Sequence, residues 1–163
     1  MTKEEKLQKI ERLYNAYLEG KLDGEIMPED ENPSFPVQSI ENYTYFTLPM
    51  ALNYQRNSYK LWESANLTYK DPKTRFVFNP KAVLYFSFEE VQEALVKYRL
   101  ALQKDKQTKI WIALCKTIID LFDGDIRKLF KMCKYDVNKI RKYMQIDYKH
   151  SFPYLSGNKL CNY

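Results

Sequence analysis

The residues best suited by type and spacing to do chemistry lie near the end of the sequence. Ser156, Gly157 and Lys159 follow a proline and directly precede the expected start of an apolar helix. A glycine allows a tight turn and a close approach of the backbone to a ligand. The N–H groups that open a helix hold phosphate oxygens, and a lysine adds positive charge. The segment therefore predicts a phosphate-binding turn, although an ordinary turn between two helices has the same pattern.

This turn resembles the hairpin of the helix-hairpin-helix superfamily of DNA glycosylases, the relatives of endonuclease III. The family hairpin runs roughly Leu-Pro-Gly-Val-Gly-x-Lys-Thr-Ala, and its backbone grips a DNA phosphate. Gly157 and Lys159 match the second glycine and the lysine. Leu155 stands where the first glycine would be, and Pro153 is one position out of register. The resemblance implies that Ser156, Gly157 and Lys159 contact DNA.

A second segment, residues 51–60, looks like the early helix of the same enzymes. In the family a glutamine there fills the gap that a flipped base leaves in the duplex, and Gln55 and Ser58 match by position. An exposed polar helix face would show the same residues. Taken together, the resemblance covers about residues 40–163 and implies a DNA-binding domain of base-excision repair type.

The catalytic part of those enzymes has no counterpart in this sequence. Their catalytic aspartate lies well beyond the hairpin, and here the sequence ends at Tyr163. Many members use a lysine at the start of the next helix, but residues 160–163 contain none. The resemblance therefore implies the DNA-gripping part at most, and leaves open whether the chain is a fragment and whether it is an enzyme.

The distribution of charge also favours a polyanionic partner. Residues 1–96 hold 11 Lys and Arg against 15 Asp and Glu, whereas residues 97–163 hold 15 against 6. A basic face attracts the phosphate backbone of nucleic acid, although it is also typical of a merely solvated surface. Arg141 and Lys142, closest to the hairpin, are expected to extend the phosphate-binding surface. They end a basic series over two short helices: Arg127, Lys128, Lys131, Lys134, Lys139, Arg141 and Lys142.

Other kinds of site find little support. The three cysteines Cys115, Cys133 and Cys161 are widely spaced, which favours reduced thiols and a cytoplasmic location over a disulfide framework. A zinc site would need all three with His150, so we expect no metal and no cofactor. No apolar run approaches the roughly 20 residues that span a membrane, so we expect no membrane partner.

Helical periodicity and capping residues predict an all-α fold, a compact orthogonal bundle with at most a minor β element. Thr2 and Glu5 can form a capping box, and Gly20 offers a left-handed stop, which together predict an N-terminal helix over 1–20. Prolines and acidic residues mark 21–38 as an exposed connector. Residues 39–163 then form the helical domain.

Within this domain, Thr47 and Pro49 predict the start of a helix that extends past Ala65, with Tyr54 on its buried side. Residues 75–78 fit a short extended stretch. The most apolar helix contains Trp111, which we expect to be buried, and ends at Gly124. Ser87 with Glu90 forms a second capping box, and Asp125 and Asp136 can cap two shorter helices.

A second function remains open on these observations. The aromatic-rich helices could bind another protein, with the lysines serving only to keep the domain soluble. Such a protein-interaction module predicts a contiguous apolar surface patch and no salt-dependent DNA binding. The oligomeric state does not follow from the sequence.

Overall fold

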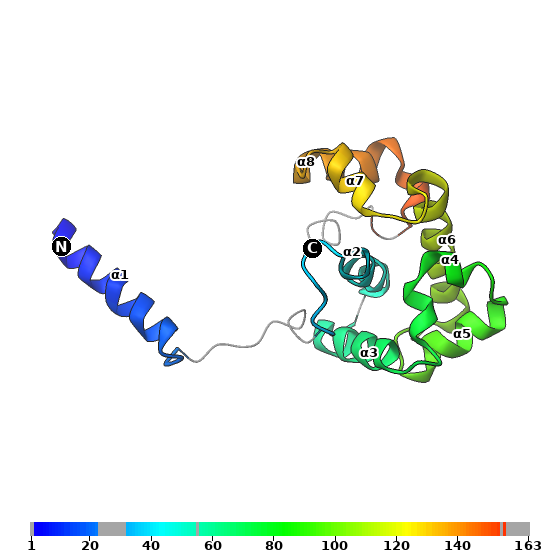
Figure 1. Cartoon of the computed structure of the whole chain (residues 1–163), viewed down its shortest axis with the longest axis horizontal. Coiled ribbons are helices and arrows are strands. Elements are labelled where there is room, and N and C mark those ends of the chain that lie inside the picture. The colour runs from blue at the N-terminus through cyan, green and yellow to red at the C-terminus, as the bar shows by residue number, and fades with distance from the viewer. Residues whose placement is uncertain (1, 23–31, 55, 154, 156–163) are drawn as a thin grey trace.

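The computed structural model describes residues 2–22, 32–54, 56–153 and 155, and this part of the chain is all-α (Figure 1). It contains no strand, which confirms the all-α prediction. The α-helices are α1 Lys3–Leu18, α2 Ile40–Thr47, α3 Ser58–Lys70, α4 Pro80–Val83, α5 Phe88–Lys97, α6 Lys104–Phe122, α7 Arg127–Met132 and α8 Val137–Lys142. Four shorter turns complete the body: the 3-10 helices η2 Pro49–Leu52, η3 Arg75–Phe78 and η5 Lys149–Ser151, and the π-helical turn η4 Tyr143–Asp147.

Helix α6 is the centre of the body formed by α2–α8. It contacts α4 and α5 on one side, and η2, α7 and η5 elsewhere along its length. Trp111 on α6 is fully buried, and its indole N–H donates to the carbonyl oxygen of Val77 at 2.8 Å. The helix ends at Asp123 and Gly124, both in the left-handed conformation. The predictions of a central apolar helix, a buried Trp111 and a stop at Gly124 are confirmed.

A cluster of aromatic rings fills the core between α2, α3 and η3. Tyr45 lies at its centre, fully buried, and contacts Trp62 and Phe78. Phe78 in turn packs edge-on against Trp111, which joins the cluster to α6. Phe35 also packs against Tyr45, with ring centroids 5.1 Å apart. Edge-to-face and offset ring pairs stabilise such cores beyond the area they bury.

Three of the predicted helix caps are confirmed, those of α1, α5 and α8. Thr2 and Glu5 form a capping box at α1, and Ser87 and Glu90 form another at α5. Asp136 accepts hydrogen bonds from two N–H groups at the start of α8. At α7 the predicted cap differs in detail. Asp125 accepts from the N–H of Arg127, but the cap position itself is Ile126.

The predicted helix running from Thr47 past Ala65 is wrong. Thr47 is the last residue of α2, which Ser39 caps. Pro49 begins the separate 3-10 turn η2, and Asn57 caps α3. Two separate elements, η2 and α3, therefore take the place of the single predicted helix. Tyr54, expected on a buried face, is half exposed as a result.

The predicted extended stretch at residues 75–78 is also wrong, because these residues form the 3-10 turn η3. The Thr74 hydroxyl donates to the carbonyl oxygen of Thr68, which folds the chain back over the end of α3. Val77 and Phe78 then point into the core. A run of only four residues carries too little periodicity to distinguish a strand from a helical turn.

Helix α1 stands apart from this body in Figure 1. None of its residues is buried, including the apolar ones whose spacing predicted it. No helix in the described part of the chain is long and apolar enough to cross a membrane.

Candidate nucleic-acid interface

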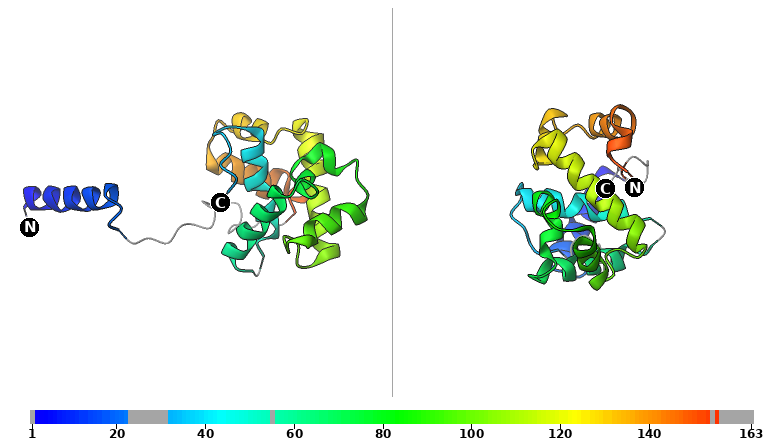
Figure 2. Two further views of the ribbon diagram at one scale, coloured as in Figure 1. Left: turned by 60° about the horizontal axis from the view of Figure 1, so that its bottom comes forward. Right: turned by 90° about the vertical axis from the view of Figure 1, so that its right-hand side faces the viewer.

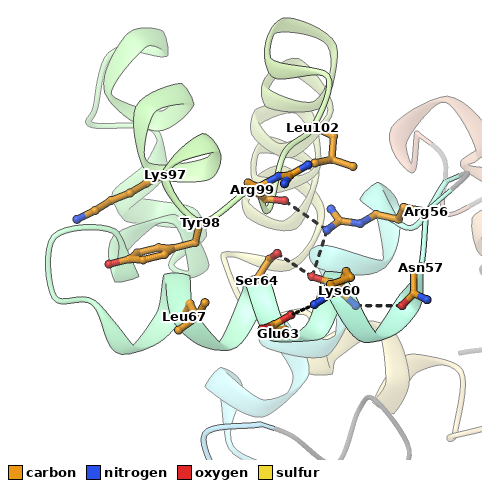
Figure 3. Close-up of a pocket in the computed structure, with 10 residues that line it drawn as sticks. All are labelled: Arg56, Asn57, Lys60, Glu63, Ser64, Leu67, Lys97, Tyr98, Arg99 and Leu102. Atoms are coloured by element: carbon orange, nitrogen blue, oxygen red, sulfur yellow. Dashed lines mark hydrogen bonds and ion pairs between the residues drawn. The ribbon is translucent and has the colours of Figure 1, made fainter.

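A groove of about 690 Å³ lies between α3 and the connection from α5 to α6 (Figure 3). One wall is a face of α3 and of the turn before it, and the other wall is the end of α5 with the residues that follow. This volume falls in the range of ordinary ligand sites. The lining residues are Arg56, Asn57, Lys60, Glu63, Ser64, Leu67, Lys97, Tyr98, Arg99 and Leu102.

The α3 wall follows from helical spacing and one cap. The Asn57 side chain accepts a hydrogen bond from the N–H of Lys60, which fixes the start of the helix. Lys60, Ser64 and Leu67 then recur every three or four residues, so they share one face. The Ser64 hydroxyl donates back to the carbonyl oxygen of Lys60 at 2.7 Å and lies at the base of this face.

The opposite wall depends on an unusual backbone conformation. Arg99 has φ of 59°, in the left-handed region that glycine favours and arginine seldom adopts. Its N–H donates to the carbonyl oxygen of Val96, which closes the end of α5. The next residue, Leu100, is fully buried and anchors this turn in the core. Arg99 itself is exposed at the groove.

Arg56 joins the two walls. Its guanidinium donates to the carbonyl oxygens of Leu100 at 2.7 Å, Lys60 at 3.2 Å and Arg99 at 3.3 Å. Its Nε is buried without a hydrogen-bond partner. Burial lowers the pKa of Arg56, and the neighbouring charge of Arg99 lowers it further. The group remains charged, because a guanidinium does not lose its proton in proteins.

Two of the four cations at the groove have carboxylate partners. Lys60 pairs with Glu63 at 2.9 Å, on the exposed side of α3. Lys97 contacts Asp71 at 2.6 Å, and the Tyr98 hydroxyl donates to the same carboxylate oxygen at 3.1 Å. The hydrogen bond from Lys97, with the N–H of Lys73 next, lowers the pKa of Asp71 to about 2.

The other two cations, Arg56 and Arg99, have no carboxylate partner within the described ranges. Arg56 is held by carbonyl oxygens, which carry only partial charges. The groove therefore keeps a surplus of positive charge, part of it on a side chain fixed in place. Such an arrangement attracts an anionic group that brings its own oxygen acceptors.

Three of the seven cations in the basic series on α7 and α8 have a carboxylate partner. Arg127 forms two hydrogen bonds with the Asp125 carboxylate and another with the carbonyl oxygen of Gln38. Lys128 pairs with Asp123, and Lys139 lies 4.0 Å from Asp136. The Nε of Arg141 is buried without a partner, and Lys142 is exposed. This surface therefore retains less free positive charge than the sequence predicts.

The predicted site residues are only partly within the described chain. Gln55, Ser156, Gly157 and Lys159 lie outside it. Ser58 is the first residue of α3, where its hydroxyl lies 3.2 Å from the side-chain nitrogen of Asn53. Arg141 and Lys142 are at the end of α8, which lies across the body from α3 (Figures 1 and 2). The structure does not bring Ser58 together with Arg141 and Lys142.

The two arginines of the groove were missed by the sequence-based reasoning. Arg56 lies inside the segment 51–60, where the family resemblance points to its neighbours Gln55 and Ser58 instead. Arg99 follows a lysine and a tyrosine directly after an amphipathic helix, which is a weak signal at most. No sequence pattern indicates that these two residues, far apart in the chain, meet at one groove.

The remaining candidates for chemistry are unremarkable in structure. His150 is exposed on η5. Cys115 and Cys133 are buried free thiols, as expected, and burial raises the pKa of both. Among the described residues, no group of three or more His, Cys, Asp and Glu could hold a metal ion.

The chain matches no family model, no curated protein and no solved structure.

Proposed function

We propose that the protein binds nucleic acid, and DNA in particular, through the groove between α3 and the α5–α6 connection. The observation that carries this proposal is the pair Arg56 and Arg99, two cations at one groove without a carboxylate partner in the described chain. Guanidinium groups form bidentate hydrogen bonds with phosphate oxygens, and a nucleic-acid backbone presents such phosphates in a regular row. The basic balance of residues 97–163 supports the same class of ligand.

The glycosylase resemblance supplies the more specific form of the proposal. In that form, Gln55 would enter the duplex, as the matching glutamine does in the family. Ser156, Gly157 and Lys159 would grip a second phosphate, and Arg141 with Lys142 would add charge. The protein would then belong to base-excision repair. This form concerns DNA binding only, because the resemblance implies no catalytic residue in this sequence.

The test is a salt series of binding to a short fluorescent DNA duplex, measured by anisotropy. Affinity should fall steeply between about 50 and about 200 mM salt, because each phosphate contact releases counterions. Arg99→Gln removes one charge and keeps a polar side chain, although a shorter one. It should weaken binding to all sequences alike and reduce the salt slope by about one.

Lys142→Gln is the matched variant on the other basic surface. If the groove is the main site and α8 only adds charge, this variant should weaken DNA binding less than Arg99→Gln does. Suppose that folded Arg99→Gln bound DNA with the affinity and salt slope of the unsubstituted protein, while Lys142→Gln bound DNA more weakly. The binding site would then lie on α8 and not at the groove. No salt-dependent binding by any of the three proteins would overturn the proposal.

The second candidate, a protein-interaction module, is favoured by a different observation. The apolar side chains of α1 form a contiguous exposed stripe, which is typical of a surface that binds protein. This candidate predicts DNA affinity that is weak and insensitive to Arg99→Gln.

A further inference from the structure

Helix α1 carries six large apolar side chains that nothing in the described chain covers. Their exposed fractions range from 49% for Leu7 to 68% for Tyr17. A contiguous apolar stripe of this kind marks a surface that binds a partner. The six residues are Leu7, Ile10, Leu13, Tyr14, Tyr17 and Leu18.

The helix also needs support that the body does not give. At 16 residues it is close to the length below which isolated helices are marginal in water. The capping box of Thr2 and Glu5 and the left-handed Gly20 stabilise its two ends. In proteins, most of the stability of a helix comes from packing of its apolar face. For α1, the partner for that packing must come from outside the described body.

The apolar residues follow the seven-residue repeat of helices that pack side by side. Leu7 and Tyr14 occupy a positions, and Ile10 and Tyr17 occupy d positions. Leu13 at g and Leu18 at e widen the stripe on both flanks. In the first repeat, leucine at a with isoleucine at d favours three or four helices over two, and apolar flanks suit the broader contact of such a bundle.

The flanking positions are complementary to a second copy of the same helix. In a parallel arrangement, each g position lies next to the e position five residues on in the neighbour. Lys6 then meets Glu11 of the next copy, and Leu13 meets Leu18. In an antiparallel arrangement of the same layers, e positions face each other, and Glu11 would oppose Glu11. The charges therefore favour the parallel orientation.

We propose that α1 binds other copies of this chain, in a parallel bundle of more than two helices. An interface needs roughly 1,000 Å² of buried surface to be specific. Six side chains on a helix about 24 Å long bury this area more readily when each helix contacts two neighbours. A membrane surface suits α1 less well, because Glu4, Glu5 and Glu11 nearly balance the basic residues of the helix. The inference is independent of DNA binding by the groove.

Sedimentation equilibrium of the full chain tests the proposal over about 10 to about 500 µM. The average mass should rise with concentration above that of a dimer. Ile10→Asp places a charge on the apolar stripe and should weaken association about tenfold or more. Gln8→Asp introduces the same charge at an outward b position of the same helix and should leave association unchanged.

Charge reversal tests the orientation. Lys6→Glu and Glu11→Lys should each weaken association about two- to fivefold, and the double variant should restore it. A protein that stays a monomer throughout would overturn the proposal. So would an equal effect of Ile10→Asp and Gln8→Asp, a limiting mass of two chains, or a double variant no better than the single ones.

Discussion

Helices α1 and α6 are the two longest in the described chain, and the sequence predicts both by the same means. Each has an apolar face at helical spacing, and each ends at a glycine with positive φ, Gly20 or Gly124. Yet α6 buries its face at the centre of the body, while α1 buries none of its residues. A periodic apolar face thus indicates that a helix must be covered, but it does not indicate what covers it.

The difference lies in the neighbours. Short connections hold α5 and α7 against α6, and Thr117 of α6 donates a hydrogen bond to the carbonyl oxygen of Ser151 on η5. Nothing in the described body reaches α1. Both tryptophans of the sequence, Trp62 and Trp111, lie in the body, so tryptophan fluorescence follows the unfolding of the body without interference from α1.

The largest expected difference between the two helices comes from truncating an aromatic side chain on each. Trp111→Ala should destabilise the body by about 3–5 kcal/mol, because it leaves a cavity and takes the donor from the Val77 carbonyl. Tyr14→Ala on α1 should change the free energy of unfolding of the body by less than about 0.5 kcal/mol. Urea titrations followed by tryptophan fluorescence and, for Trp111→Ala, by circular dichroism measure both. Similar effects of the two variants would show that α1 packs on the body.

A smaller difference is expected at the two glycines. Alanine at Gly124 must adopt φ of 83°, which should cost the body about 1 kcal/mol. The added Cβ would lie 2.8 Å from Cε of Lys81, but that flexible side chain can move away. Gly20→Ala meets no atom within 4 Å and should leave the unfolding of the body unchanged. A loss of body stability in Gly20→Ala would contradict the separation of the two regions.

The two capping boxes offer a matched pair of substitutions. Ser87→Ala removes the cap of α5 and should destabilise the body by about 1 kcal/mol. Thr2→Ala removes the same kind of cap from α1, so it should reduce the helical signal in circular dichroism and leave the fluorescence transition in place. The pair fails as a comparison if Thr2→Ala shifts the fluorescence midpoint as much as Ser87→Ala does.

The smallest expected effect is the pH dependence that Asp71 gives to the body. Its pKa of about 2 in the folded protein lies below the value of about 3.9 in an unfolded chain. Its contribution is therefore complete above about pH 4 and is lost as the pH falls towards 2. Asp71→Asn should be less stable than the unsubstituted protein at neutral pH, and the gap should close between about pH 4 and 2. A gap independent of pH would mean that the ion pair with Lys97 is not its cause.

Sequence reasoning succeeded where the signal is local. The all-α fold, the two capping boxes and the burial of Trp111 each depend on a few adjacent residues or on one periodic face. It failed at Thr47, where Ser39 and Asn57 provide the caps instead, and at residues 75–78, where the preceding residue Thr74 folds the chain into a turn. Thr74 folds back onto α3 through Thr68, and nothing in residues 75–78 themselves indicates this.

The candidate site was harder to predict, because its residues come from distant parts of the chain. The segment around Ser58 was found, but the arginines that give the groove its charge were not. Arg56 becomes part of a site only because it bonds to carbonyl oxygens of Arg99 and Leu100, more than forty positions along the chain. Arg99 faces the groove from a left-handed turn that its residue type disfavours. Neither the hydrogen bonds of Arg56 nor the left-handed turn at Arg99 can be predicted from residue types and their spacing.

Because Cys115 is deeply buried, the reactivity of its thiol reports local unfolding of the body. The thiol is fully enclosed on α6, and burial raises its pKa, so in the folded state it is both inaccessible and protonated. Alkylating reagents attack only an accessible thiolate. The rate at which Cys115 is labelled therefore measures how often the packing around α6 comes apart, without denaturant. Cys133, which is 5% exposed just after α7, would become accessible to the same reagents through smaller movements.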